Sequence, residues 1–202
     1  MLIRGHKALL GILMLAFAAL PARAADTAVP DRVLGDPKAP VTVQEFVSLT
    51  CSHCADFYNN ILPQLKEKYV DSGKVRFILR DFPLDGIGLK AAVIARCMPE
   101  DEFYPFITVL YKNQVNWALN AAPETILTQY AKLGGLSEDK AKACLADTKM
   151  QDAIVAERTE AQQKYGVSAT PTFVVNGTDK LQGAQPVEKF AAAFDKALAA
   201  KH

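Results

Sequence analysis

Two cysteines separated by only two residues lie between a β-rich apolar run and a segment with helical spacing of apolar residues. The preceding residues, VTVQEF at 41–46, are apolar and β-rich and predict a buried strand. From 57 to 69, apolar side chains recur at helical spacing, and we expect Pro63 to bend this helix rather than to end it. Cys51 and Cys54 therefore lie at a strand-to-helix junction, with Cys51 at the helix N-terminus.

This position favours a reactive thiolate at the first cysteine. Unpaired backbone N–H groups and the helix dipole stabilise an anion at a helix N-terminus. We therefore expect Cys51 to have a lowered pKa and to be the exposed nucleophile, with Cys54 buried one turn behind it. His53 should stabilise the thiolate further by a hydrogen bond or a positive charge; the alternative is a solvated surface histidine without a role.

A cysteine pair of this spacing can hold a metal, form a permanent crosslink or undergo reversible oxidation. As a crosslink it closes a very small ring, which gains little from loop-closure entropy. A zinc site needs a second ligand pair, but Cys97 and Cys144 stand alone, and the other histidines, His6 and His202, lie near the chain ends. A reversible redox pair is the interpretation that remains.

The first 24 residues have the three parts of a secretory signal peptide. Arg4 and Lys7 precede an uninterrupted apolar run at 8–20, and Ala22-Arg23-Ala24 supplies a small-x-small cleavage pattern. The apolar run is shorter than the roughly 20 residues that span a bilayer, so we expect cleavage rather than a retained anchor. The mature chain is then expected to begin near Ala25, outside the cytoplasm, and not to be membrane-embedded.

The charge of the mature chain is nearly balanced. Removing Arg4, Lys7 and Arg23 changes 23 basic against 22 acidic residues into 20 against 22, a net charge of about −2. This balance gives no support for nucleic acid or an anionic membrane surface as a partner. The length of the mature chain fits one domain with a sizeable core, with room for an inserted subdomain.

The block EFVSLTCSHC at 45–54 resembles the active-site block of the DsbA-type thiol–disulfide oxidoreductases, which are thioredoxin-fold proteins of the bacterial periplasm. Their block ends in Cys-Pro-His-Cys, so Ser52 stands where the family has proline. Because the two intervening residues tune the redox couple, Ser52 leaves the strength of oxidation open. The resemblance implies an α/β fold, with a central mixed β-sheet flanked by helices.

The spacing of the next strands indicates an insertion in that fold. A second strand is expected at about 75–80, and the next clear strand begins about 90 residues later, in TPTFVVNG at 170–177. A plain thioredoxin has a single helix between them, whereas this stretch is helical in pattern throughout, and family members carry a helical insertion at this point. We expect a signal peptide at 1–24 and a thioredoxin domain in two parts, at 25–85 and 151–202. Between these two parts we expect an inserted α-helical domain at 86–150.

The segment TPTFVVNG carries the second element of the resemblance. Pro171 is awkward in a central strand but fits if the Thr170–Pro171 bond is cis. In the family this backbone lies beside the cysteine pair and binds substrate peptide in strand fashion, which makes Thr170 and Pro171 candidate substrate-binding residues. Asn176 and Gly177 predict a type I′ turn into the following strand.

Glu45 lies six residues before Cys51 in an otherwise apolar strand, where an unpaired charge would be costly. One interpretation is a surface residue at the strand edge. The resemblance implies instead a buried acid beneath the active site that exchanges protons with Cys54. Such burial should raise the pKa of the carboxyl.

Cys97 and Cys144 fall in two of the helices expected in the insertion. An even number of cysteines in an exported chain suggests pairing, and some members of the family carry an extra bridge there. We expect a structural disulfide, worth roughly 3–4 kcal/mol in the chain-entropy model. Two buried free thiols are the alternative.

Together these features predict a periplasmic dithiol oxidase that works through Cys51 and Cys54 and needs no metal or organic cofactor. The resemblance implies unfolded exported proteins with free cysteines as substrates and a quinone-linked, DsbB-like membrane protein as the redox partner. Two alternatives stay open. One is a disulfide isomerase or reductase of the same fold, although about 16 residues before the first strand are too few for the usual dimerisation region. The other is a periplasmic protein that binds Cu(I) or another soft metal.

Overall fold

The computed structural model describes residues 29–200, and the predicted signal peptide lies outside this range. Within the described range, no helix has the length and apolar character needed to cross a membrane.

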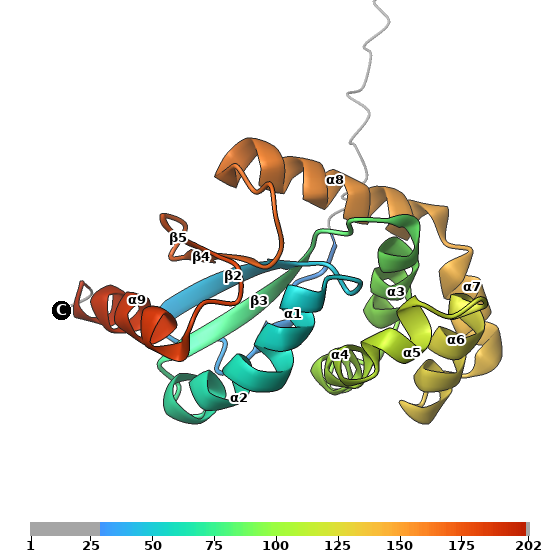
Figure 1. The fold of residues 1–202 in the computed structure, drawn as a ribbon, viewed down its shortest axis with the longest axis horizontal. Coiled ribbons are helices and arrows are strands. Elements are labelled where there is room, and N and C mark those ends of the chain that lie inside the picture. Colours follow the sequence, from blue (N-terminus) through green and yellow to red (C-terminus); the bar gives the residue numbers. More distant parts are fainter. Residues whose placement is uncertain (1–28, 201–202) are drawn as a thin grey trace, which may run out of the picture.

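Five strands of the described chain form one mixed sheet in the order β1-β3-β2-β4-β5 (Figure 1). At its centre, β2 (Val41–Val47) and β3 (Val75–Asp81) run parallel. Next to β2, β4 (Thr172–Val175) pairs antiparallel, and β5 (Asp179–Gln182) pairs antiparallel with β4 at one edge. The short β1 (Val33–Leu34), which the sequence pattern did not predict, is antiparallel to β3 at the other edge.

Alternation along β2 determines which side chains face each side of the sheet. Val41, Val43 and Val47 belong to the main hydrophobic core, whereas Phe46 packs in a smaller cluster with residues of the opposite face. Glu45 has the same parity as the three valines, so its side chain enters the main core, where the long helix after β2 also packs.

That helix is continuous from 52 to 70 but is not regular. Its four segments are α1 (Ser52–Asp56), the π-helical η1 (Phe57–Ile61), α2 (Leu62–Leu65) and the π-helical η2 (Lys66–Val70). Pro63 has no N–H to donate to the preceding turn, and a wider π-helical turn lies directly before α2. The helix therefore passes through Pro63 with a local irregularity rather than ending there, as expected.

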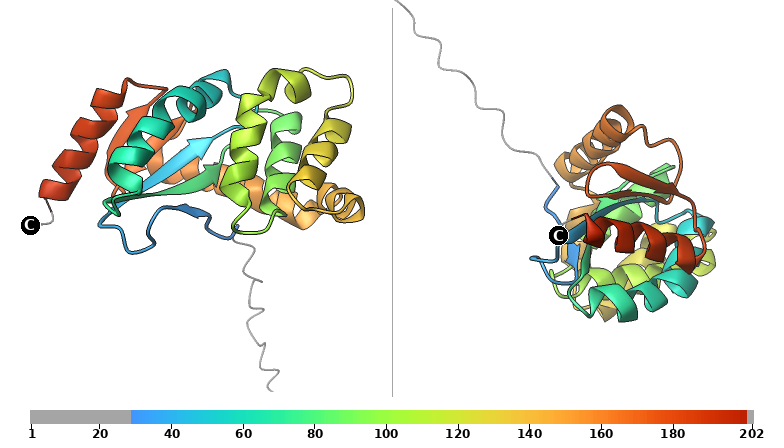
Figure 2. Two further views of the ribbon diagram at one scale, coloured as in Figure 1. Left: turned by 90° about the horizontal axis from the view of Figure 1, so that it is seen from below. Right: turned by 90° about the vertical axis from the view of Figure 1, so that its left-hand side faces the viewer.

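Six helices connect β3 to β4. They are α3 (Gly86–Arg96), α4 (Phe103–Lys112), α5 (Gln114–Ala118), α6 (Pro123–Leu133), α7 (Glu138–Leu145) and α8 (Thr148–Tyr165). The first five gather beyond one end of the sheet, and α8 returns along the sheet face opposite α1 (Figures 1 and 2). The last helix, α9 (Val187–Ala199), packs on the same face as α2.

This arrangement confirms the predicted fold class, a mixed sheet flanked by helices with a helical insertion. The exact domain boundaries stay predictions, and α8 runs through the one proposed at 150. The turn at Asn176 and Gly177 has positive φ at both residues, 49° and 81°. Those values are the ones that a type I′ turn requires.

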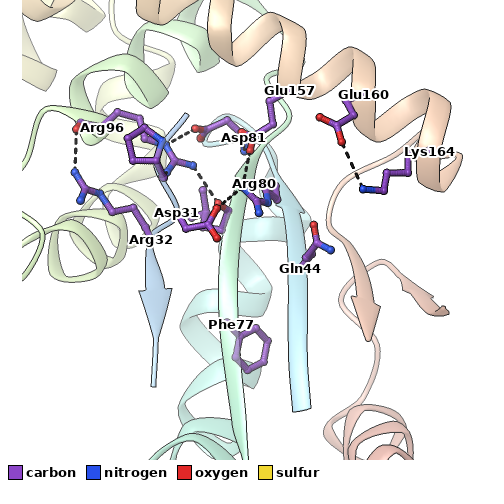
Figure 3. Close-up of polar contacts among 12 residues, drawn as sticks. Asp31, Arg32, Gln44, Phe77, Arg80, Asp81, Arg96, Glu157, Glu160 and Lys164 are labelled. Carbon is purple, nitrogen blue, oxygen red and sulfur yellow. Dashed lines mark hydrogen bonds and ion pairs between the residues drawn. The ribbon is translucent and has the colours of Figure 1, made fainter. Parts of the chain in front are cut away.

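A buried ion pair joins the sheet to the insertion (Figure 3). Arg96, at the end of α3, donates from Nε to Oδ2 of Asp81, at the end of β3, at 2.6 Å, and both side chains are almost completely buried. The other guanidinium nitrogens of Arg96 donate to two backbone carbonyls. Glu157 of α8 accepts from the Asp81 backbone N–H at 3.0 Å and pairs with Arg80 at 3.1 Å.

Replacing Arg96 with methionine is expected to lower the free energy of unfolding by about 3–5 kcal/mol, because Asp81 would stay buried without its counter-charge. Chemical denaturation of the purified protein measures this loss. The matched control is Lys142→Met, which breaks the exposed pair with Glu138 and should change stability very little, because water and salt screen such a pair. An Arg96→Met loss no larger than that of the control would contradict the prediction.

Candidate active site

The two cysteines of the pair occupy different environments on the same turn of α1. Cys51 is the N-cap residue, with extended backbone angles, and its carbonyl accepts the first helical bond, from the N–H of Ala55 at 3.1 Å. Cys54 lies inside the helix and is completely buried. Both are free thiols in this structure. Cys51 is only 8% exposed, so it is more enclosed than the exposed nucleophile that we expected.

The electrostatics of the pair favour a single thiolate, on Cys51. A hydrogen bond from the Cys54 thiol lowers the pKa of Cys51 to about 5; burial opposes this shift, and the backbone N–H groups of Cys54 and His53 add to it. Burial, followed by the hydrogen bond with Cys51, raises the pKa of Cys54 well above its usual value. At neutral pH the reduced pair therefore holds one negative charge, at the helix N-terminus.

The residues between the cysteines point into solvent. The side chains of Ser52 and His53 are both exposed. His53 contributes to the Cys51 thiolate through its backbone N–H, as expected of a helix start. The stabilising role that we expected of its imidazole stays a prediction.

The loop before β4 covers the first cysteine. The Thr170–Pro171 peptide bond is cis, and the carbonyl of Thr170 lies 3.4 Å from the Cys51 Sγ, where it accepts a hydrogen bond from the neutral thiol. Thr170 is itself buried. This contact, between residues far apart in the sequence, places the Thr170 backbone directly beside the Cys51 sulfur.

Helices of the insertion hold the turn that carries Cys51. Gln114, at the start of α5, donates from Nε2 to the carbonyls of Leu49 and Cys51, at 2.8 and 3.0 Å. Tyr111 of α4 donates its hydroxyl to the Ser48 carbonyl at 3.2 Å. The sequence pattern gave no signal for these contacts, because they join segments about 60 residues apart.

A second set of polar contacts joins the same turn to α3. The Thr50 hydroxyl donates to Oδ2 of Asp85 at 2.7 Å, and the Ser48 and Thr50 hydroxyls are 3.0 Å apart. Asp85 also caps α3 by accepting from the N–H of Gly88 at 2.6 Å. The cysteine turn is therefore fixed from two sides by the inserted helices.

Glu45 is completely buried rather than exposed at a strand edge. The hydroxyl of Tyr58 donates to its Oε1 at 2.5 Å, while Oε2 has no partner in the described part of the chain. Burial raises the pKa of Glu45 to about 8, and the bond from Tyr58 opposes this shift. Tyr58, the hydrogen-bond partner of Glu45, belongs to the same buried cluster as Cys54.

Cys97 and Cys144 form a disulfide that joins the end of α3 to α7, with 6.4 Å between the Cα atoms. It lies within the insertion and is separate from the Cys51–Cys54 pair. Among residues 29–200, no group of three or more metal-ligating side chains comes together.

Comparison with known proteins agrees with this geometry. A family model described as Thioredoxin matches residues 27–196. A Rickettsia felis protein named as a protein-disulfide oxidoreductase is 34% identical over 169 residues, which are 83% of this chain and 60% of that protein. This chain thus spans about three-fifths of the Rickettsia relative. Disulfide bond formation protein D of Bacillus cereus is 30% identical over 150 residues, 71% of this chain and 69% of that protein.

A solved structure is similar along most of the chain. It is that of α-DsbA1 from Wolbachia pipientis, with 34% sequence identity and a TM-score of 0.77. The match covers 90% of this chain and 93% of that protein.

Proposed function

Since this chain belongs to the thioredoxin-fold family of DsbA-type disulfide oxidoreductases, we propose that it is an exported dithiol oxidase that passes the Cys51–Cys54 disulfide to other exported proteins. The observation that carries this proposal is the asymmetry of the pair: a pKa of about 5 at Cys51 and a strongly raised one at Cys54. Stabilising the reduced thiolate makes the disulfide the less stable form, and this drives oxidation of the substrate.

The reaction that we propose transfers two electrons from substrate to enzyme. A substrate thiolate attacks the Cys51 sulfur of the oxidised pair; the Cys51–Cys54 bond breaks, and Cys54 leaves as a thiolate that takes a proton from Glu45. A second substrate thiolate then attacks the substrate sulfur of the mixed disulfide. The substrate disulfide forms, and Cys51 departs as its stabilised thiolate.

Binding of the substrate is assigned to the loop before β4. An extended peptide would pair with the backbone at Thr170, whose carbonyl lies 3.4 Å from the Cys51 sulfur. Strand pairing of this kind uses main-chain groups, so it accepts many sequences, as a catalyst for varied unfolded proteins must.

The resemblance and the predicted signal peptide support the rest of the proposal. The substrates are unfolded periplasmic proteins with free cysteines, and a DsbB-like membrane protein reoxidises the pair. Metal binding, the alternative from a different class, receives no support from the relatives. An oxidase passes its disulfide to the substrate, whereas an isomerase or reductase works with the reduced Cys51–Cys54 pair, so the direction of disulfide transfer separates these functions.

The reduction potential of the Cys51–Cys54 pair tests this direction. The mature protein, with Cys97 and Cys144 intact, is equilibrated in glutathione buffers, and a Cys51→Ser/Cys54→Ser variant corrects for any signal from the second disulfide. An oxidase is expected near about −120 mV, the reference value of DsbA itself, a member of this family. A value of about −200 mV or lower would refute the oxidase assignment and indicate an isomerase or reductase.

A further inference from the structure

The acid beneath the cysteine pair is held by a phenol. Tyr58 donates to Oε1 of Glu45 at 2.5 Å, and both residues are buried. We propose that Tyr58 is a positioning residue, which orients Glu45 for proton exchange with Cys54 and makes its ionised form accessible during turnover. This inference rests on the proposed function, in which Glu45 is the proton-exchanging group.

Among the described neighbours of Glu45, Tyr58 is the residue that hydrogen-bonds its carboxyl group. In the sheet, its neighbours on β3 and β4 are Leu79 and Phe173, which do not titrate. From the helices, Glu45 acts electrostatically on three phenols, Tyr58 of η1 and Tyr104 and Tyr111 of α4. The thiol that the proposed function pairs with it is Cys54 of α1. Among residues 29–200, no lysine or arginine forms a salt bridge with Glu45, and the Tyr58 hydroxyl is the group that hydrogen-bonds its side chain.

Tyr58 is held firmly in this orientation. Its ring lies 4.5 Å from that of Tyr111, centroid to centroid. The Tyr111 hydroxyl donates to the Ser48 carbonyl, which also accepts from the backbone N–H of Cys51 at 3.1 Å. The two phenols therefore connect the buried acid to the turn that carries the nucleophile.

The same helix carries both groups that Glu45 must reach. Cys54 and Tyr58 are four residues apart on the continuous helix 52–70, and such residues project from one side of a helix. Tyr58 occupies one carboxyl oxygen of Glu45 and leaves Oε2 without a partner. That oxygen is the one available to give a proton to Cys54 or to take one from it.

The hydrogen bond matters most when the pair is reoxidised. In that direction the Glu45 carboxylate takes the proton from the Cys54 thiol. The Cys54 thiolate then attacks the Cys51 sulfur of a mixed disulfide; the Cys51–Cys54 bond forms, the bond from Cys51 to the other sulfur breaks, and that sulfur leaves as a thiolate. A hydrogen bond to the charged form of a buried carboxyl favours ionisation. Without the Tyr58 hydroxyl, the carboxyl would have to ionise with no donor, so less of the active base would be present at neutral pH.

The test follows the resolution of one mixed disulfide as a function of pH. Reduced mature protein is mixed with oxidised glutathione, and acid-quenched samples are analysed by mass spectrometry for the Cys51–glutathione adduct and its conversion to the Cys51–Cys54 disulfide. In Tyr58→Phe, we expect the midpoint of the rate profile to move to higher pH and the resolution rate at pH 7 to fall about tenfold. The absorbance titration of the Cys51 thiolate should stay unchanged.

Two further variants separate positioning from general packing. Tyr69→Phe is the matched control: Tyr69 lies on the same long helix as Tyr58, and its hydroxyl donates to the carboxylate of Asp195 on α9 at 2.9 Å. The rate profile of this variant should equal that of the wild type. Fluorotyrosine placed at Tyr58 keeps the hydroxyl but makes it a stronger donor, so the midpoint should move to lower pH. It also tests the inference if the phenylalanine variant folds poorly.

Glu45→Gln distinguishes the failure of this inference from that of the proposed role of Glu45. If Glu45→Gln removes the pH-dependent limb and Tyr58→Phe leaves it unmoved, Tyr58 is only structural and the inference is overturned. If Glu45→Gln leaves the limb intact, the role of Glu45 in the proposed function fails and the inference falls with it. If the two changes act through one group, Tyr58→Phe should have no further effect in the Glu45→Gln background.

Discussion

Replacing Cys51 with serine is expected to abolish transfer of a disulfide to a reduced dithiol peptide, lowering the rate by roughly a thousandfold or more. A serine hydroxyl is not ionised at neutral pH and cannot carry a disulfide. The pKa of Cys51, lowered to about 5, makes this sulfur the thiolate of the reduced pair at neutral pH. Formation of the peptide disulfide, followed by mass spectrometry, measures the loss.

Cys54→Ala is the informative partner of that variant. It keeps the nucleophile, so reduced protein should form a mixed disulfide with glutathione, but it cannot resolve that adduct, which should accumulate at one per chain. The hydrogen bond from Cys54 is the largest cause of the low pKa of Cys51. Its removal should therefore raise the pH at which Cys51 is half alkylated by iodoacetamide. Equal activity of Cys51→Ser and the wild type, or accumulation of a glutathione adduct on Cys54 in the Cys51→Ser variant, would reverse the assignment of the two roles.

Features that depend on local pattern could be predicted from the sequence. The apolar, β-rich run at 41–46 and the helical spacing after it predicted Cys51 at a helix start, where the structure has it. Ser137 followed by two acidic residues is a pattern typical of a helix N-terminus, and its side chain accepts from the N–H of Lys140 at the start of α7. The cis bond before Pro171 followed from a family resemblance, since local sequence alone favours trans.

Features that depend on contacts across the chain could not be predicted. Gln114 and Asp85 lie in helical or loop patterns that carry no sign of their bonds to the cysteine turn. From the sequence alone, Arg96 has the pattern of an exposed helix residue, whereas in the folded chain it is buried and donates to Asp81. Tyr58 has the spacing of an ordinary core aromatic, and its role appears only when β2 places Glu45 below its hydroxyl.

The enclosure of Cys51 shows how one such contact changes the chemistry. A helix N-terminus alone predicts an exposed thiolate, whereas the Thr170 loop leaves 8% of the residue accessible. Partial burial by itself disfavours a charge. In this structure the Cys54 thiol and the backbone N–H groups outweigh it. Reactivity is therefore combined with a restricted approach, along the backbone edge that we assign to the substrate.

Burial of Glu45 should make the stability of the protein depend on pH. Its pKa is about 8 in the folded chain, against 4.5 for the ordinary group. Because the folded state binds the proton more tightly, the free energy of unfolding should fall as pH rises from about 4.5 to about 8. Below about pH 4.5 and above about pH 8, the contribution of Glu45 to the free energy of unfolding should be constant. Each pKa unit corresponds to about 1.4 kcal/mol, so the full loss is roughly 5 kcal/mol.

Glu45→Gln should remove this loss, because the amide carries no charge at any of these pH values. Relative to the wild type, the variant should gain up to roughly 5 kcal/mol on going from pH 4.5 to pH 9. Urea denaturation across this range measures the difference. Taking the difference also cancels the contribution of Glu157, whose pKa burial raises to about 7. The control is Glu160→Gln, which changes an exposed acid of α8 and should leave the profile unaltered. If the difference between wild type and Glu45→Gln stays flat across the window, Glu45 is not held as a buried neutral acid, and it could not serve as the proton donor to Cys54.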